Sequence, residues 1–215
     1  MKKQIGLFGG SFNPIHSAHI ELAQSTLKIF NLDKLLFLPA NISPFKSPDL
    51  EKNKFHRLNM LKLALTNYPK FAISEYELTK GGPSLTIDTI RFFQSKYPSV
   101  EFYLIMGEDS FDSITSWHSF KEIFSTINII VYPRENYCFK QTIINKFPDF
   151  KEIKSDIENI SKFSTLNKNS LFFLNLPFLK GSSTQARLDF KEEKTCFNLI
   201  PPEVIEYIKK NNLYC

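Results

Sequence analysis

A short apolar segment that ends in two glycines, followed directly by a helical pattern, most constrains how this chain can fold. The apolar run covers Gln4–Phe8, and Gly9 and Gly10 end it. Residues Ser17–Ile29 then carry apolar side chains at helical spacing, and a second apolar run covers Lys34–Leu38. A strand, a helix and a second strand within about 35 residues form a β–α–β unit. The two strands are therefore predicted to be parallel, with a right-handed crossover.

The same alternation of strand and helix patterns continues along the chain. Further helices are predicted at Phe55–Thr66, Ser84–Lys96, Phe120–Phe124, Thr184–Phe190 and Pro202–Lys210. Further strands are predicted at Phe71–Tyr76, Phe102–Met106, Asn128–Tyr132 and Leu171–Leu174. The polar stretch Asn41–Lys54 is typical of a loop, and the lysine-rich stretch Gln141–Asn169 has no clear assignment. This order predicts an α/β fold with a parallel sheet, as a single domain over residues 1–215 with a helical C-terminal portion at about 182–215.

Composition excludes several classes of protein. With 42% hydrophobic and 23% charged residues the chain is globular, and no apolar run reaches the ~18 residues of a membrane span. Cys138, Cys196 and Cys215 show no paired spacing, which favours a reducing compartment, and we expect a cytoplasmic protein with no membrane partner. The net charge of +5 comes mostly from scattered lysines, so no nucleic-acid partner is expected; a DNA- or RNA-binding protein is the weakest alternative.

The segment from Gly9 to His19 has the residue types of a phosphate site. Glycines after a strand let backbone approach a ligand closely, and the N-terminus of the following helix offers unpaired N–H groups and a positive dipole end. His16 and His19 are three residues apart, so we expect them on one helix face and pointing toward the same anion. Both would be stronger donors as charge builds in a transition state.

Other interpretations of these histidines remain open. A His-x-x-His pair is often a surface or core feature, and it could be half of a metal site. The sequence has only four histidines, no H-E-x-x-H and no cysteine pair, so we predict no protein metal site. The Walker A and G-x-G-x-x-G patterns are also absent, which argues against the P-loop and dinucleotide-binding fingerprints.

A second candidate anion site lies near the other end of the chain, in the segment Gly181–Arg187. Ser183 and Thr184 stand where a helix should be capped and begin, and Arg187 follows one turn later. Hydroxyls, backbone N–H groups and a guanidinium together suit phosphate. The alternative is an ordinary capped helix with a surface arginine.

Together the motifs resemble a known family. Gly9–His19 is similar to the T/H-x-G-H motif of the nucleotidyltransferases, in its G-G-T/S-F-D/N-P-x-H-x-G-H form, and Gly181–Arg187 to their I-S-S-T-x-I-R motif. Three further stretches resemble the bacterial nicotinate-mononucleotide adenylyltransferases, in family order: Gly82–Thr89, Gly107–Ser110 with Trp117, and Ile200–Tyr214. The resemblance spans nearly the whole chain. It implies a Rossmann-like, doubly wound parallel sheet with helices on both faces and a helical C-terminal end.

The resemblance also implies an activity and a set of residues. The family joins ATP to nicotinate mononucleotide, a step of NAD biosynthesis that gives deamido-NAD and pyrophosphate, with Mg²⁺ bound mainly through the ATP phosphates. His16, His19 and Arg187 would be catalytic. The residues implied to bind ATP are Gly9, Gly10, Ser11, Phe12, His16, His19, Lys46, Gly107, Asp109, Ser183, Thr184 and Arg187. Those implied to bind the mononucleotide are Asn41, Lys46, Ser84, Leu85, Thr86, Trp117 and Arg134.

The chain departs from the family pattern at five positions. Ala18 replaces the usual glycine, Phe45 a histidine, Leu85 a tyrosine, and Gly181 and Ala186 two isoleucines. None of these changes removes a charged or donor group from the two phosphate motifs. Two alternatives stay open: another nucleotidyltransferase, of pantetheine-phosphate or cytidylyl type, and a non-catalytic nucleotide-binding module on the same fold. The oligomeric state is also open, with a homodimer as one option.

Overall fold

The chain folds into two compact units, each built from segments that are distant in the sequence. The computed structural model describes residues 2–42, 53–132, 139–165, 167, 169–175, 181–192, 194 and 199–214. Unit 1 comprises residues 1–9 and 85–178, and unit 2 comprises residues 10–84 and 179–215. Neither unit is a continuous stretch, and one domain over 1–215 stays a prediction.

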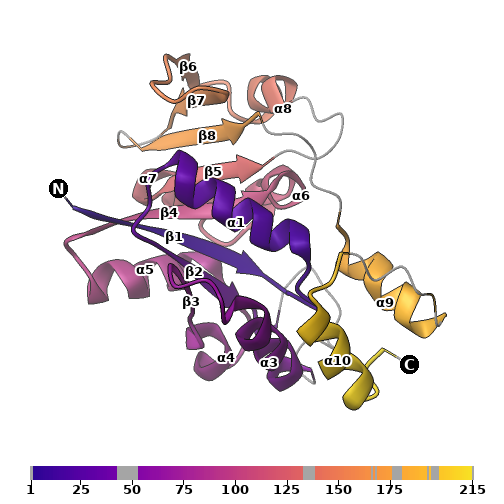
Figure 1. Cartoon of the computed structure of the whole chain (residues 1–215). Helices are drawn as coiled ribbons and strands as arrows, with labels where there is room; N and C mark the ends of the chain where they lie inside the picture. The colour runs from indigo at the N-terminus through magenta and orange to yellow at the C-terminus, as the bar shows by residue number, and fades with distance from the viewer. Residues whose placement is uncertain are drawn as a thin grey trace. The chain divides into compact units, whose positions relative to one another are not determined.

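Unit 1 is built around a mostly parallel sheet (Figure 1). Its strands are β1 (Lys3–Gly10), β4 (Val100–Gly107), β5 (Asn128–Tyr132), β6 (Lys151–Ile153), β7 (Ile160–Ser164) and β8 (Ser170–Leu174). They follow the order β1-β4-β5-β8-β7-β6, with β1, β4, β5 and β8 parallel and β6 and β7 added antiparallel. Its helices are α5 (Thr86–Lys96), α6 (Glu108–Asp112), the 3₁₀ turn η1 (Ile114–Ser116), α7 (Phe120–Thr126) and α8 (Phe139–Lys146).

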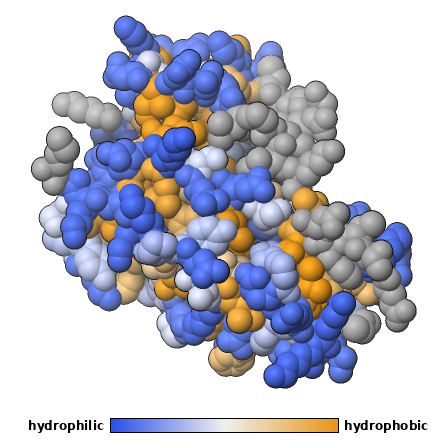
Figure 2. Space-filling view, in the orientation of Figure 1, coloured by the Kyte–Doolittle hydropathy of each residue, from blue (hydrophilic) through white to orange (hydrophobic). Residues whose placement is uncertain are grey.

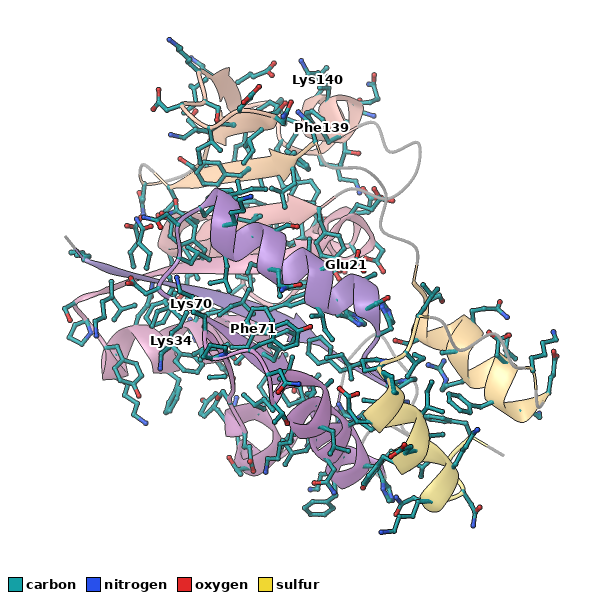
Figure 3. The ribbon with its side chains drawn as sticks, viewed as in Figure 1. Glu21, Lys34, Lys70, Phe71, Phe139 and Lys140 are labelled. Carbon is teal, nitrogen blue, oxygen red and sulfur yellow. The ribbon has the colours of Figure 1, made fainter. Side chains whose placement is uncertain are left out.

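Phenylalanine rings fill part of the core of unit 1. Several of them come from in or beside the lysine-rich stretch whose secondary structure the sequence did not indicate. Phe139 of α8 stacks on Phe173 of β8 at 4.6 Å between ring centroids, and Phe147 lies 5.0 Å from Phe124. The neighbouring Lys140 points to solvent and pairs with Glu152 of β6 at 3.2 Å (Figure 3). Residues 139–165 thus form a helix and two antiparallel strands whose aromatic side chains pack inward while the lysines stay outside.

Unit 2 contains the first helix, two parallel strands and the last two helices. Its elements are α1 (Ser17–Ile29), β2 (Lys34–Pro39), α3 (Lys54–Leu65), β3 (Phe71–Ile73), α4 (Tyr76–Lys80), α9 (Ser183–Lys191) and α10 (Pro202–Lys210). Leu35 of β2 is in register with Phe71 of β3, and the neighbouring Lys34 and Lys70 lie at the same end of this pair (Figure 3). Tyr207 of α10 is hydrogen-bonded by Asn59 of α3, so these two helices pack together.

The predicted α/β class with parallel strands is confirmed, and most predicted elements are present. Several details differ from the prediction. The strand predicted at Phe71–Tyr76 ends at Ile73, because residues from Tyr76 onward turn into α4. The helix predicted from Ser84 begins at Thr86, with Leu85 as an extended N-cap residue. The short helices α6 and η1 were not predicted, since they are too short to show helical periodicity.

The surface agrees with the mixed composition. Hydrophilic residues cover much of the face seen in Figure 2, interrupted by smaller hydrophobic areas. In the described part of the chain, no helix is both long and apolar enough to span a membrane.

Candidate active site

The loop between β1 and α1 is shaped by close packing around Gly10 and Phe12. Phe12 is buried and has a backbone φ of 47°, in the left-handed region. A Cβ atom at Gly10 would come within 2.8 Å of the Phe12 ring, so only glycine fits there without displacing that ring. At Gly9, by contrast, a Cβ would meet no atom within 4 Å. The exposed backbone at Gly9 therefore leaves the open approach that a phosphate ligand requires.

The two histidines of the first motif stack on each other at the start of α1. Their ring centroids are 3.6 Å apart at an interplanar angle of 28°. His16 is the N-cap residue of α1 in extended conformation, and His19 is the third helical residue. The two rings thus lie side by side at the start of α1, and His16 stands just before its first helical residue. The backbone N–H of His16 donates to Nδ1 of His19 at 3.3 Å. Neutral His19 therefore carries its proton on Nε2, which can donate.

The carbonyl groups of this loop accept hydrogen bonds from side chains far away in the sequence. Arg187 Nη1 donates to the Asn13 carbonyl oxygen at 2.8 Å, and the Ser183 hydroxyl donates to that of Pro14 at 2.9 Å. Arg57 Nη1 donates to the Ser11 carbonyl oxygen at 2.8 Å. The first motif and the last motif, separated by more than 160 residues, thus meet directly within unit 2.

The start of α9 has a different cap from the one predicted. Ser182 is the N-cap residue, and its side chain accepts a hydrogen bond from the Gln185 backbone N–H at 3.3 Å. Ser183 and Thr184 are the first two helical residues, and Arg187 Nη2 donates to the Thr184 hydroxyl at 3.3 Å. The cap thus belongs to Ser182, which leaves the Ser183 hydroxyl to bind the Pro14 carbonyl.

Two departures from the family pattern, Ala18 and Gly181, lie against each other. A Cβ atom at Gly181 would stand 2.8 Å from the Ala18 Cβ and 2.7 Å from Nδ1 of His16. Real Cβ atoms do not approach other atoms so closely, because repulsion rises steeply inside van der Waals contact. The methyl group of Ala18 thus occupies space that a side chain at position 181 would need.

Asn41 lies at the centre of a second polar cluster in unit 2. Its backbone N–H donates to the Ser84 hydroxyl at 2.9 Å, and its Nδ2 donates to the Gly82 carbonyl oxygen at 3.1 Å. The side chain is only 1% exposed, and its Oδ1 accepts no hydrogen bond from the residues that the structure describes. An acceptor buried in this way favours a ligand that donates, because an unsatisfied polar atom is unfavourable.

In unit 1, Asp109 lies where β4 passes into α6. Its Oδ1 accepts a hydrogen bond from the Ser110 backbone N–H at 3.0 Å. A Cβ atom at Gly107 would come within 2.7 Å of this oxygen and 3.2 Å of the Tyr132 ring, so a side chain there would displace the Asp109 carboxylate. The carboxylate is exposed and can accept from ribose hydroxyls.

Trp117 and the start of α5 also belong to unit 1. Trp117 follows η1, and its indole Nε1 donates to the Ser113 hydroxyl at 3.4 Å. Thr86 is the first residue of α5, an 11-residue helix whose first N–H groups can bind an anion.

Two predicted site residues, Lys46 and Arg134, lie outside the described residues, as does Phe45. Within unit 2 the structure brings together the predicted residues Gly10, Ser11, Phe12, His16, His19, Ser183, Thr184 and Arg187, whereas Gly9 belongs to unit 1. It places Asn41 beside Ser84 in the same unit. Leu85, Thr86, Gly107, Asp109 and Trp117 belong to unit 1.

Two residues of this site were missed from the sequence. Arg57 is fully buried, and its guanidinium also donates to the Ala40 carbonyl oxygen at 2.6 Å; burial lowers its pKa to about 10. The Tyr214 hydroxyl donates to Oδ1 of Asn13 at 2.6 Å. Arginine is scarce in this sequence, and that scarcity could have drawn attention to Arg57. The residues around Tyr214 in the sequence do not indicate that it contacts Asn13.

Comparison with known proteins agrees with this arrangement. The profile of the cytidylyltransferase-like family matches residues 7–187. A probable nicotinate-nucleotide adenylyltransferase of Caldicellulosiruptor bescii is 35% identical over 98% of both chains. A relative of the same name from Clostridium botulinum is 35% identical over 97% of both. This chain belongs to the nicotinate-nucleotide adenylyltransferase family.

Solved structures of this family share the fold. The nicotinic acid mononucleotide adenylyltransferase of Plasmodium falciparum, complexed with NaAD, matches 99% of this chain with a TM-score of 0.77 at 23% identity, and 97% of its own chain is covered. This likeness confirms the predicted Rossmann-like class, and the relatives at 35% identity confirm the enzyme class predicted from the motifs. A nicotinate-nucleotide adenylyltransferase is a nucleotidyltransferase of NAD biosynthesis.

Proposed function

We propose that this protein transfers the adenylyl group of ATP to nicotinate mononucleotide and releases pyrophosphate. The observation that carries the proposal is the meeting of the two phosphate motifs in unit 2. Ser183 and Arg187 bind the carbonyls of the loop that leads to His16, while the rings of His16 and His19 stack. Unit 2 thus brings the Arg187 cation near the loop that carries both imidazoles and the N-terminus of α1, and all of these groups suit a polyphosphate.

The reaction needs no protein nucleophile. A phosphate oxygen of the mononucleotide attacks the α-phosphorus of ATP and forms the new P–O bond. The bond from the α-phosphorus to the bridging oxygen breaks, and pyrophosphate leaves with the electron pair. Catalysis then consists of positioning the two phosphates and stabilising the charge that builds on the oxygens.

His19 has the tautomer that this role requires. Its Nδ1 accepts from the backbone, so the neutral ring carries its proton on Nε2, the nitrogen that would donate to a phosphate oxygen. His16, Arg187, Ser183 and Thr184 would bind the ATP phosphates beside it, with Lys46 from the loop outside the described residues. Gly9, Gly10, Ser11 and Phe12 would supply the backbone that approaches them.

Mg²⁺ would be carried by the ATP phosphates. The described residues contain no group of three or more His, Cys, Asp or Glu side chains arranged to hold a metal ion. Mg²⁺ keeps water and phosphate ligands readily and needs few from the protein. When bound, the ion neutralises phosphate charge.

Several groups, each taken within its own unit, suit the mononucleotide. Asn41 offers its buried Oδ1, with Ser84 and Leu85 nearby in the chain. Thr86 begins α5, whose first N–H groups suit the nicotinate carboxylate. Trp117 would stack on the pyridine ring, Arg134 would contact the phosphate, and Gly107 and Asp109 would contact the ATP ribose.

The experiment is pyrophosphate release with a panel of substrates. ATP or CTP is offered with nicotinate mononucleotide, nicotinamide mononucleotide or phosphopantetheine. We expect turnover with ATP, and a kcat/KM for the carboxylate form about 10–100 times that for the carboxamide. A carboxamide NH₂ would face N–H donors, a mismatch of roughly 1–3 kcal/mol. Turnover with phosphopantetheine or CTP would support the other nucleotidyltransferases, and no turnover with any pair would support a non-catalytic module.

Three further features of the protein stay predictions. We propose a cytoplasmic location and small-molecule partners alone, with no nucleic acid. Gel filtration of the purified protein decides between a monomer and a homodimer.

A further inference from the structure

Tyr214 is anchored on the loop that carries the first phosphate motif. It follows α10, and its hydroxyl donates to Oδ1 of Asn13 at 2.6 Å across 201 residues of sequence. Its ring lies 6.2 Å from that of Phe190, on the same helix as Arg187. Tyr214 therefore contacts the first motif through its hydroxyl and the helix of the last motif through its ring.

Asn13 is where this contact meets the proposed phosphate site. Its side-chain oxygen accepts from Tyr214, while its backbone carbonyl accepts from Arg187 Nη1 at 2.8 Å. The next carbonyl, that of Pro14, accepts from Ser183. A displacement of Asn13 would therefore move the acceptor that orients the Arg187 guanidinium.

The electrostatic surroundings of Tyr214 keep its hydroxyl a donor. Burial raises its pKa above the ordinary value, although the nearby charges of Arg187 and Arg57 act in the opposite direction. The hydroxyl thus stays protonated at neutral pH. The backbone of Tyr214 has a φ of 70°, a conformation that a non-glycine residue keeps only where its surroundings impose it.

We propose that Tyr214 is a positioning residue for ATP, which fixes Asn13 and, through Asn13, the direction of the Arg187 guanidinium. This inference rests on the proposed function of the site. Carbonyl oxygens of the loop would repel phosphate if they turned toward it. Arg187 and Ser183 donate to the carbonyls of Asn13 and Pro14, and Tyr214 holds the Asn13 side chain. These contacts keep the carbonyls turned toward donors on the protein.

The test compares Tyr214→Phe with Tyr207→Phe. Each variant loses only a hydroxyl, and each hydroxyl is hydrogen-bonded within unit 2, but that of Tyr207 contacts His56 and Asn59. We expect Tyr214→Phe to lower kcat/KM for ATP about tenfold, as for one lost hydrogen bond, and to leave KM for nicotinate mononucleotide unchanged. Tyr207→Phe should leave both constants unchanged. Equal constants for Tyr214→Phe and the wild type, or an equal loss in Tyr207→Phe, would overturn the proposal.

A double variant tests whether Tyr214 acts through Arg187. Arg187→Lys removes the fork of donors, so adding Tyr214→Phe should then lower kcat/KM for ATP less than twofold further. A full tenfold further loss would show that Tyr214 acts independently of Arg187. Calorimetric ATP binding separates this proposal from the proposed function. If the wild type transfers no adenylyl group, weaker ATP binding by Tyr214→Phe still supports the positioning role, and unchanged binding refutes it.

Discussion

Replacing Arg57 by methionine should destabilise the protein strongly, although the new side chain is apolar and of similar length. The guanidinium is fully buried and donates to the carbonyl oxygens of Ser11 and Ala40, at 2.8 and 2.6 Å. These carbonyls belong to the segments after β1 and after β2. Arg57→Met leaves these two partly buried acceptors without their donors, and each hydrogen bond to a charged group contributes about 1.5–3 kcal/mol.

One effect opposes this loss. Burial lowers the pKa of Arg57 to about 10, and holding the charged guanidinium out of water costs on the order of 3 kcal/mol. Methionine is free of that cost. Both bonds are short and charged, so we take the upper end, about 6 kcal/mol for the two; less the desolvation cost, this leaves a net destabilisation of about 3 kcal/mol.

The assay is urea unfolding followed by circular dichroism. With a slope of about 2 kcal/mol/M, a loss of 3 kcal/mol lowers the midpoint by about 1.5 M. Arg91→Met is the matched control, because Arg91 is exposed and pairs with Glu122 on the surface. It should change stability by less than about 1 kcal/mol. A midpoint of Arg57→Met within 0.3 M of the wild type, on the order of 0.6 kcal/mol, would refute the reasoning.

Two further predictions concern the histidine pair. His19→Ala should reduce kcat about 10²–10³-fold with little change in mononucleotide binding, because one preorganised donor is lost. The control is His56→Ala, since the His56 ring contacts Tyr207. A near-native kcat in His19→Ala would show that His19 is merely structural. Gly181→Ile should displace the His16 ring and lower kcat, because a Cβ at position 181 would lie within 2.8 Å of both His16 and Ala18. Adding Ala18→Gly to this variant should restore part of the activity. Independent, additive effects of the two substitutions on kcat would contradict this packing.

Periodicity alone located most helices and strands, because it depends on neighbours in the sequence. The helix Ser17–Ile29 and the strand Asn128–Tyr132 were predicted with the bounds that they have in the structure. Helices of three to five residues, such as α4 and α6, do not complete enough turns to show a period, and they were missed. The antiparallel pair β6 and β7 was also missed, because its lysines obscure the alternation.

The sequence by itself determined the chemistry of the phosphate motifs, since glycines, histidines and the Ser-Ser-Thr-x-x-Arg pattern are local features. Only the tertiary structure decided how those groups are held. Arg57 reaches Ser11 across 46 residues, and Tyr214 reaches Asn13 across 201. The exclusion between Ala18 and Gly181 likewise joins positions that are remote in sequence. Such pairings depend on which surfaces the folded backbone brings within a few ångströms, and no local pattern of side chains encodes that distance.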